Sequence, residues 1–133
     1  MNQQSWHFTV VQNQPMIRRL TKGCQKMMGV ETDPFYGAPT LILVTGKEGN
    51  IAPVADCALA MENMFLAAAS LGLGSCWINC VGRYLTTEEG RRFAQDAGIP
   101  QGYAGVGCMI LGYPKGPAPQ PKERAAGAVH FVR

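Results

Sequence analysis

The fold is decided by residues 53–78, PVADCALAMENMFLAAASLGLGSCWI, where a long apolar segment leads into a glycine-rich turn and a short apolar stretch. Pro53 suits the first turn of a helix, helix formers continue to Leu71, and Gly72 is placed to stop the helix. The helix is apolar nearly all round, but its middle carries polar side chains that are costly in lipid, namely Asp56, Glu62 and Asn63. The segment therefore predicts a helix, residues 54–71, buried in a core or at a subunit interface.

Short runs of β-branched and aromatic residues predict strands on either side of this helix. Residues 6–11 (WHFTVV) form a strand that begins almost at the first residue, and residues 40–45 (TLILVT) are typical of a strand buried on both faces. Residues 103–111 predict another strand, whose internal glycines indicate close backbone approach. A last short strand is expected at residues 128–132. The pattern leaves open whether the strands pair in parallel or antiparallel fashion.

Two further helices complete the expected architecture. Residues 14–28 are amphipathic, and we interpret their basic stripe as a solvated face. Residues 86–89 (TTEE) have the spacing of a capping box and predict a short helix through Ala97. Residues 72–78 are expected to form a glycine-rich turn that leads into a short apolar stretch, counted as a loop before the next helix, and residues 112–121 a proline-rich arm. The order of elements predicts an α+β class and one domain over residues 1–133.

Composition narrows the possible functions. The chain has 133 residues, 47% of them hydrophobic, and a net charge of +3, which is too small to indicate a nucleic-acid or membrane partner. Residues 1–9 carry no feature of a secretory signal, so a cytoplasmic location is the default. Five scattered cysteines fit reduced thiols better than a disulfide framework, and their spacing supports no metal site.

The sequence contains no evident acid–base pair or nucleophile motif, and two features point instead to a bound ligand. Trp6 and Trp77 stand beside small or polar residues and are suited to framing a planar molecule. Lys122 and Arg124 lie on the same side of an extended segment, a geometry suited to gripping a phosphate. Each feature alone is also what a core tryptophan or a solvated basic cluster produces.

Four segments, in order along the chain, resemble the FMN-dependent nitroreductase family. Residues 2–8 (NQQSWHF) are similar to the family's Asn-x-Gln-Pro-Trp-x-Phe segment. Residues 71–78 (LGLGSCWI) resemble the turn after its long central helix, whose backbone lies against the flavin ring. Residues 106–114 (VGCMILGYP) resemble its last core strand, and Lys122 and Arg124 resemble its late basic pair that holds the flavin phosphate.

This resemblance implies an α+β homodimer, with a nitroreductase-like central sheet flanked by helices and two flavin sites at the subunit interface. In the family, NAD(P)H delivers a hydride to FMN, and the reduced flavin passes electrons to a nitroaromatic, quinone or similar acceptor in a ping-pong cycle. The flavin carries the chemistry, so no side chain is assigned a catalytic role. Asn2 and Gln4 are expected to contact the flavin of the partner subunit. The cofactor-binding residues implied are Asn2, Gln4, Ser75, Cys76, Trp77, Ile78, Asn79, Lys122 and Arg124.

The sequence departs from the family in two places. Ser5 stands where the family usually has proline, and the chain contains no Arg-Arg-Ser-x-Arg motif ahead of Asn2. We therefore expect an N-terminally truncated nitroreductase whose given start is internal to the protein. Two alternatives stay open: a non-catalytic α+β interaction domain with an incomplete flavin pocket, and a binding module for another planar ligand.

Overall fold

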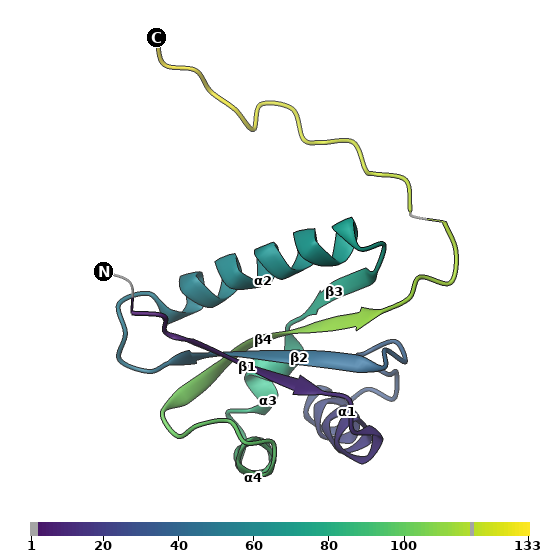
Figure 1. Cartoon of the computed structure of the whole chain (residues 1–133), viewed down its shortest axis with the longest axis vertical. Coiled ribbons are helices and arrows are strands. Elements are labelled where there is room, and N and C mark those ends of the chain that lie inside the picture. Colours follow the sequence, from purple (N-terminus) through teal and green to yellow (C-terminus); the bar gives the residue numbers. More distant parts are fainter. Residues whose placement is uncertain (1–2, 118) are drawn as a thin grey trace.

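The computed structural model describes residues 3–117 and 119–133, which form a four-stranded sheet with helices on both faces and a C-terminal arm (Figure 1). The strands are β1 (Trp6–Val11), β2 (Thr40–Lys47), β3 (Gly74–Ile78) and β4 (Tyr103–Gly112), in the spatial order β1-β2-β4-β3. All three neighbouring pairs are antiparallel, which answers the question that the sequence pattern left open. β1 and β3 are therefore the two edges of the sheet.

Four helices cover the sheet unequally. They are α1 (Gln14–Met28), α2 (Pro53–Ser70), α3 (Cys80–Tyr84) and α4 (Glu88–Asp96). α2 lies over one face, and α1, α3 and α4 lie on the other (Figure 1). Each face has its own apolar cluster, so both sides of the central strands β2 and β4 are buried, as the continuous apolar run in β2 predicts.

The predicted positions of the two long helices are confirmed. α1 has the predicted bounds, and it begins where the Asn13 side chain accepts a hydrogen bond from the Met16 amide at 3.0 Å. α2 begins at Pro53, buries Cys57 and Met61 against the sheet, and leaves leucines exposed on its outer side. Among the described residues, no helix has the length and apolar character needed to cross a membrane.

Three expectations are wrong in detail. Residues 72–85 are more than a turn and loop, because they contain β3 and α3, elements too short for periodicity to reveal. The N-cap of α4 is Thr87, whose hydroxyl accepts from the Gly90 amide at 3.0 Å, rather than the Thr86 that a capping box requires. Residues 128–132 form no strand, since no other strand of this chain lies beside them.

Two glycines allow α3 to lie directly on β4. A β-carbon added at Gly82 would lie 3.0 Å from the carbonyl oxygen of Val106, and one added at Gly105 would lie 3.1 Å from the Gly82 α-carbon. Such short separations mean that helix and strand touch through their backbones. This contact fixes α3 at the end of β3, where the candidate site lies.

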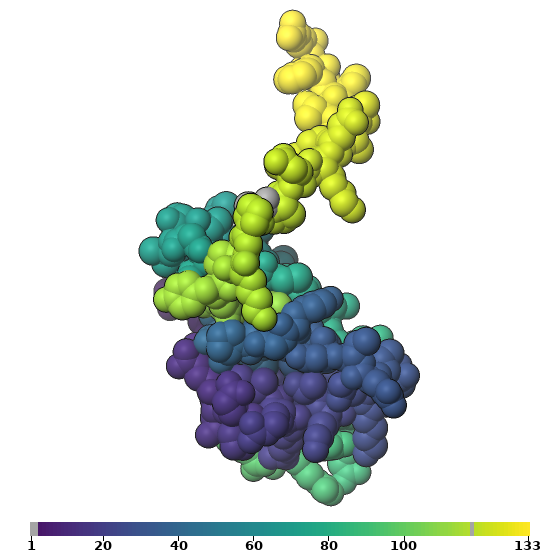
Figure 2. Space-filling model, turned by 90° about the vertical axis from the view of Figure 1, so that its right-hand side faces the viewer, coloured from purple at the N-terminus to yellow at the C-terminus, as the bar shows by residue number. Residues whose placement is uncertain are grey.

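The last residues form an arm. After β4, residues 113–117 and 119–133 contain no helix or strand, and the arm extends away from the sheet (Figures 1 and 2). Its side chains are exposed, including the apolar Val129, Phe131 and Val132.

Candidate functional site

The free edge of β3 presents the first part of the site. Ser75 and Cys76 are exposed on this strand. Within the described part of the chain, β3 pairs only with β4, so its other edge leaves backbone N–H and C=O groups without a partner strand. These groups can hydrogen-bond to the polar rim of a planar molecule laid against the strand.

Trp77 and Ile78 form the rigid part of the same strand. Ile78 is buried in the cluster beneath α1 and α3. Trp77 is half-buried on the α2 side, and its ring rests on Gly107, where an added β-carbon would lie 2.7 Å from a ring carbon. Opposite faces of β3 are thus held by two different apolar clusters, which keeps the exposed edge in place.

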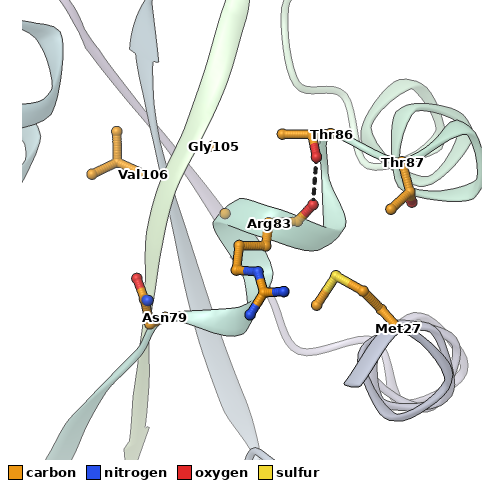
Figure 3. Close-up of a pocket in the computed structure, with 8 residues that line it drawn as sticks. Met27, Asn79, Arg83, Thr86, Thr87, Gly105 and Val106 are labelled. Carbon is orange, nitrogen blue, oxygen red and sulfur yellow. Dashed lines mark hydrogen bonds between the residues drawn. The ribbon is translucent and has the colours of Figure 1, made fainter. Parts of the chain in front are cut away.

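A hollow of about 520 Å³ begins at the end of β3 (Figure 3). Asn79, the residue after β3, lies at its rim and is exposed, and its side chain makes no capping bond to α3. The guanidinium of Arg83 lies between Asn79 and Met27 in Figure 3. Gly105 and Val106 of β4 form the opposite wall. The hollow therefore joins the β3 edge to a positively charged group.

The hydroxyls beside this hollow already have partners. Thr86 donates to the Arg83 carbonyl at 2.8 Å, and Thr87 donates to the Tyr84 carbonyl at 2.7 Å. Arg83 has no ion-pair partner among residues 3–117 and 119–133. The sequence analysis did not identify Arg83, because a single cation on a five-residue helix belongs to no motif and to no periodic pattern.

Gln4 lies at the opposite edge of the sheet from the β3 group. It is exposed just before β1, and its backbone φ is +45°, which is strained for a residue other than glycine. Three strand spacings separate β1 from β3, a distance of roughly 14 Å. The predicted site residue Asn2 lies outside the described residues.

Ser5, which replaces the family's proline, has a specific partner. It is buried, and its hydroxyl donates to the Asp56 carboxylate at 2.7 Å. Asp56 lies in the first turn of α2, where a negative charge is favourable. The serine therefore ties the start of β1 to α2.

Lys122 and Arg124 are exposed on the C-terminal arm, which extends away from the sheet (Figure 1). The structure thus brings together Ser75, Cys76, Trp77, Ile78 and Asn79, and leaves Gln4 and the two arm cations apart from them. Assignment of any of these residues to a cofactor stays a prediction.

Two buried thiols lie in the core and not at this site. Burial raises the pKa of the Cys24 thiol strongly, and raises the pKa of Cys108 to about 12, so both stay protonated at neutral pH. In the part of the chain that the structure describes, no three His, Cys, Asp or Glu side chains are grouped to hold a metal ion.

Solved structures with this architecture include nitroreductases that were crystallised with bound FMN. A crystal structure of a nitroreductase with bound FMN from Bacteroides fragilis is 33% identical and superposes with a TM-score of 0.91, covering 100% of this chain and 79% of that one. A second nitroreductase with bound FMN, from Desulfitobacterium hafniense, is 26% identical with a TM-score of 0.87, covering 100% and 78%. A model of the nitroreductase family matches residues 1–113, and the chain therefore belongs to this family.

Two sequence relatives agree with that assignment. Proteins from Archaeoglobus fulgidus and Methanothermobacter thermautotrophicus are each 31% identical to this chain over 86% of its length, and each is named as a candidate NADH dehydrogenase/NAD(P)H nitroreductase. The chain spans 64% and 58% of the length of these relatives.

Proposed function

We propose that this chain binds FMN along the free edge of β3 and acts as an oxidoreductase, passing electrons from NAD(P)H to nitroaromatic, quinone or similar acceptors. The observation that carries the proposal is the exposed and unpaired edge at Ser75–Asn79, held rigid from both sides of the sheet. Membership of the nitroreductase family and similarity to two FMN-bound nitroreductases support it.

The residues of β3 fit a flavin ring. The strand offers backbone donors and acceptors along an open edge, which match the carbonyl and nitrogen atoms on the ring's polar side. Ser75 and Cys76 are small, so they leave room for a planar group to approach the backbone. When bound, FMN supplies the capacity to accept and return a hydride. The chain's own part is to bind the ring, hold it flat and shape access to it.

The flavin phosphate needs cations, and we assign this role to Lys122 and Arg124. Both are exposed on the arm, so they are available to bind an anion, and Arg matches phosphate geometry with paired N–H groups. Gln4 lies at the opposite edge of the sheet from β3 of its own chain, which favours a site completed by the Gln4 and Asn2 segment of a second copy.

Exposed apolar surface favours the same homodimer. Helix α2 is apolar nearly all round, and its outer side is not covered by the rest of the chain: Leu59 and Leu66 are 66% and 61% exposed. The arm also exposes Phe131 at 74%. Burial of such side chains stabilises association by roughly 25 cal/mol per Å² of apolar surface. A reducing compartment such as the cytoplasm fits the free cysteines of the described chain.

Comparing FMN with riboflavin tests the cofactor assignment. Simultaneous Lys122→Ala and Arg124→Ala substitutions remove two phosphate contacts and are expected to weaken FMN binding about a hundredfold, at about 1.5 kcal/mol for each charge-assisted bond. Riboflavin, which has no phosphate, should bind the double variant and the parent chain equally. Lys115→Ala, on the same arm, is the matched control. Equal FMN affinity in the double variant and the parent would contradict the assignment.

Anaerobic titration with NADH and NADPH tests the activity. If the proposal is right, either nucleotide bleaches the visible absorbance of bound flavin, and a nitroaromatic or quinone restores it. Flavin that binds but is never bleached would favour a non-catalytic flavin-binding domain. A chain that binds no flavin would contradict the proposal altogether.

A further inference from the structure

The hollow beside Asn79 has a charge distribution that the flavin assignment does not explain. Its walls are Met27, Asn79, Gly82, Arg83, Thr86, Thr87, Gly105 and Val106, so one cation and no carboxylate line it. Arg83 is exposed and has no ion pair among the described residues, whereas Arg19 and Arg92 pair with carboxylates. An unpaired guanidinium facing a neutral hollow attracts an anionic group.

The two carboxylates in the first turn of α4 are paired with other cations. Glu89 lies in the neighbouring depression, where its carboxylate pairs with Lys26 of α1 at 3.3 Å. Glu88 pairs with Arg92 within α4. Arg91 of α4 donates to the Thr86 carbonyl at 2.6 Å. Arg83 therefore faces the hollow without a competing carboxylate.

The position of Arg83 relative to β3 sets which molecule can reach it. Asn79 is the last exposed residue of the β3 edge, and Arg83 follows four residues later, one turn of α3. Four residues of an α-helix rise roughly 6 Å along its axis. The backbone contact between Gly82 and Gly105 fixes this turn on β4, so the cation has a defined place beside the edge.

Resting on the proposed function, we propose that Arg83 and this hollow bind the anionic group of the molecule that exchanges electrons with the flavin. The chemistry required is a phosphate or a carboxylate carried beside a planar reacting ring. A pyridine dinucleotide carries phosphates, and an acidic acceptor such as a nitrobenzoate carries a carboxylate. Either molecule, stacked on a flavin bound at the β3 edge, would extend its charged part over α3.

Direct binding tests the site without any flavin. Inorganic pyrophosphate and benzoate are titrated into the ¹⁵N-labelled chain, and the amide signals of Gly82 and Gly105 are followed. We expect saturable shifts with at least one of the two probes, a dissociation constant about tenfold higher in Arg83→Ala, and partial recovery in Arg83→Lys. Lys22→Ala on α1, an exposed cation away from this hollow, should bind like the parent. Equal binding in Arg83→Ala and the parent, or no shift at these amides, would overturn the site.

Steady-state kinetics distinguish the two sources. If the anion belongs to the donor, Arg83→Ala raises KM for NADH about tenfold and leaves kcat nearly unchanged. If it belongs to the acceptor, KM rises for nitrobenzoate and not for uncharged nitrobenzene. A loss of affinity for FMN but not riboflavin would overturn the inference, because Arg83 would then belong to the cofactor phosphate. Failure of the parent chain to bind flavin would refute the proposed function, while the pyrophosphate and benzoate titrations would still decide the site.

Discussion

Replacing Gly90 by alanine is expected to destabilise the chain, although alanine is the better helix former. A β-carbon at Gly90, in the first turn of α4, would lie 1.9 Å from the Tyr84 carbonyl oxygen and 2.8 Å from the Leu85 α-carbon. Both atoms belong to backbone, so no side-chain rotation relieves the overlap. The Tyr84 carbonyl also accepts hydrogen bonds from the amide and the hydroxyl of Thr87, at 2.9 and 2.7 Å.

In the Gly90→Ala chain, the gain in helix propensity is smaller than the cost of overpacking and lost hydrogen bonds. Alanine in a helix is favoured over glycine by about 1 kcal/mol. Overpacking against fixed neighbours costs about 1 to 3 kcal/mol, and each hydrogen bond lost from the Tyr84 carbonyl costs about 1 kcal/mol more. The balance lowers the free energy of unfolding by about 3 kcal/mol, which corresponds to a Tm lower by about 10 °C.

Thermal and urea unfolding, followed by circular dichroism, measure this loss. Gly116→Ala is the control, because nothing lies within 4 Å of a β-carbon at that position. Its stability should match that of the parent. A Gly90→Ala chain as stable as the parent would refute the packing of α4 on the end of α3, and with it the geometry of the Arg83 hollow.

Three further predictions concern side chains rather than packing of the backbone. Tyr84→Phe should raise the free energy of unfolding by about 1 kcal/mol in urea titrations, because the Tyr84 hydroxyl is buried without a hydrogen-bond partner among the described residues; a lower value would show that it has one. Cys76 is exposed and Cys108 is buried. A thiol-reactive disulfide reagent should therefore label Cys76 rapidly in the folded chain and label Cys108 only after unfolding. Rapid labelling of Cys108 in the folded chain would be inconsistent with its burial. Cys108 has a pKa of about 12 when folded and about 8.5 when unfolded. The stability it contributes is therefore complete below about pH 8.5 and is lost as the pH rises towards 12, which urea midpoints across that range would reveal.

Much of the fold follows from local pattern. The bounds of α1 were predictable because apolar side chains at helical spacing coincide with a capping Asn13 and a terminating Gly29. β2 was predictable because a strand buried on both faces needs an unbroken apolar run. The five-residue α3 was not, since it spans little more than one turn and its place depends on backbone contact with β4.

The candidate site was predictable only in part. The segment 75–79 was identified through family resemblance, and the structure shows why it is accessible, since β3 is an edge strand. Strand order depends on pairings between distant residues, so the separation of Gln4 from β3 could not be derived from spacing. Arg83 was missed because its significance comes from the neutral walls contributed by α1 and β4.

Whether residues 128–132 form a strand depends on a partner strand to pair with. Their β-branched and aromatic residues favour a strand, yet a strand needs a pairing partner, and within the described chain these residues have none. A second copy of the chain would offer one at either open sheet edge. The local prediction and the structure of a single chain therefore differ for a physical reason.

Sedimentation of the purified chain with added FMN, recording absorbance of protein and flavin together, tests the central claim most directly. The account predicts a single species with the mass of a dimer that carries one FMN for each chain. A flavin-free monomer sedimenting apart from unbound FMN would contradict it.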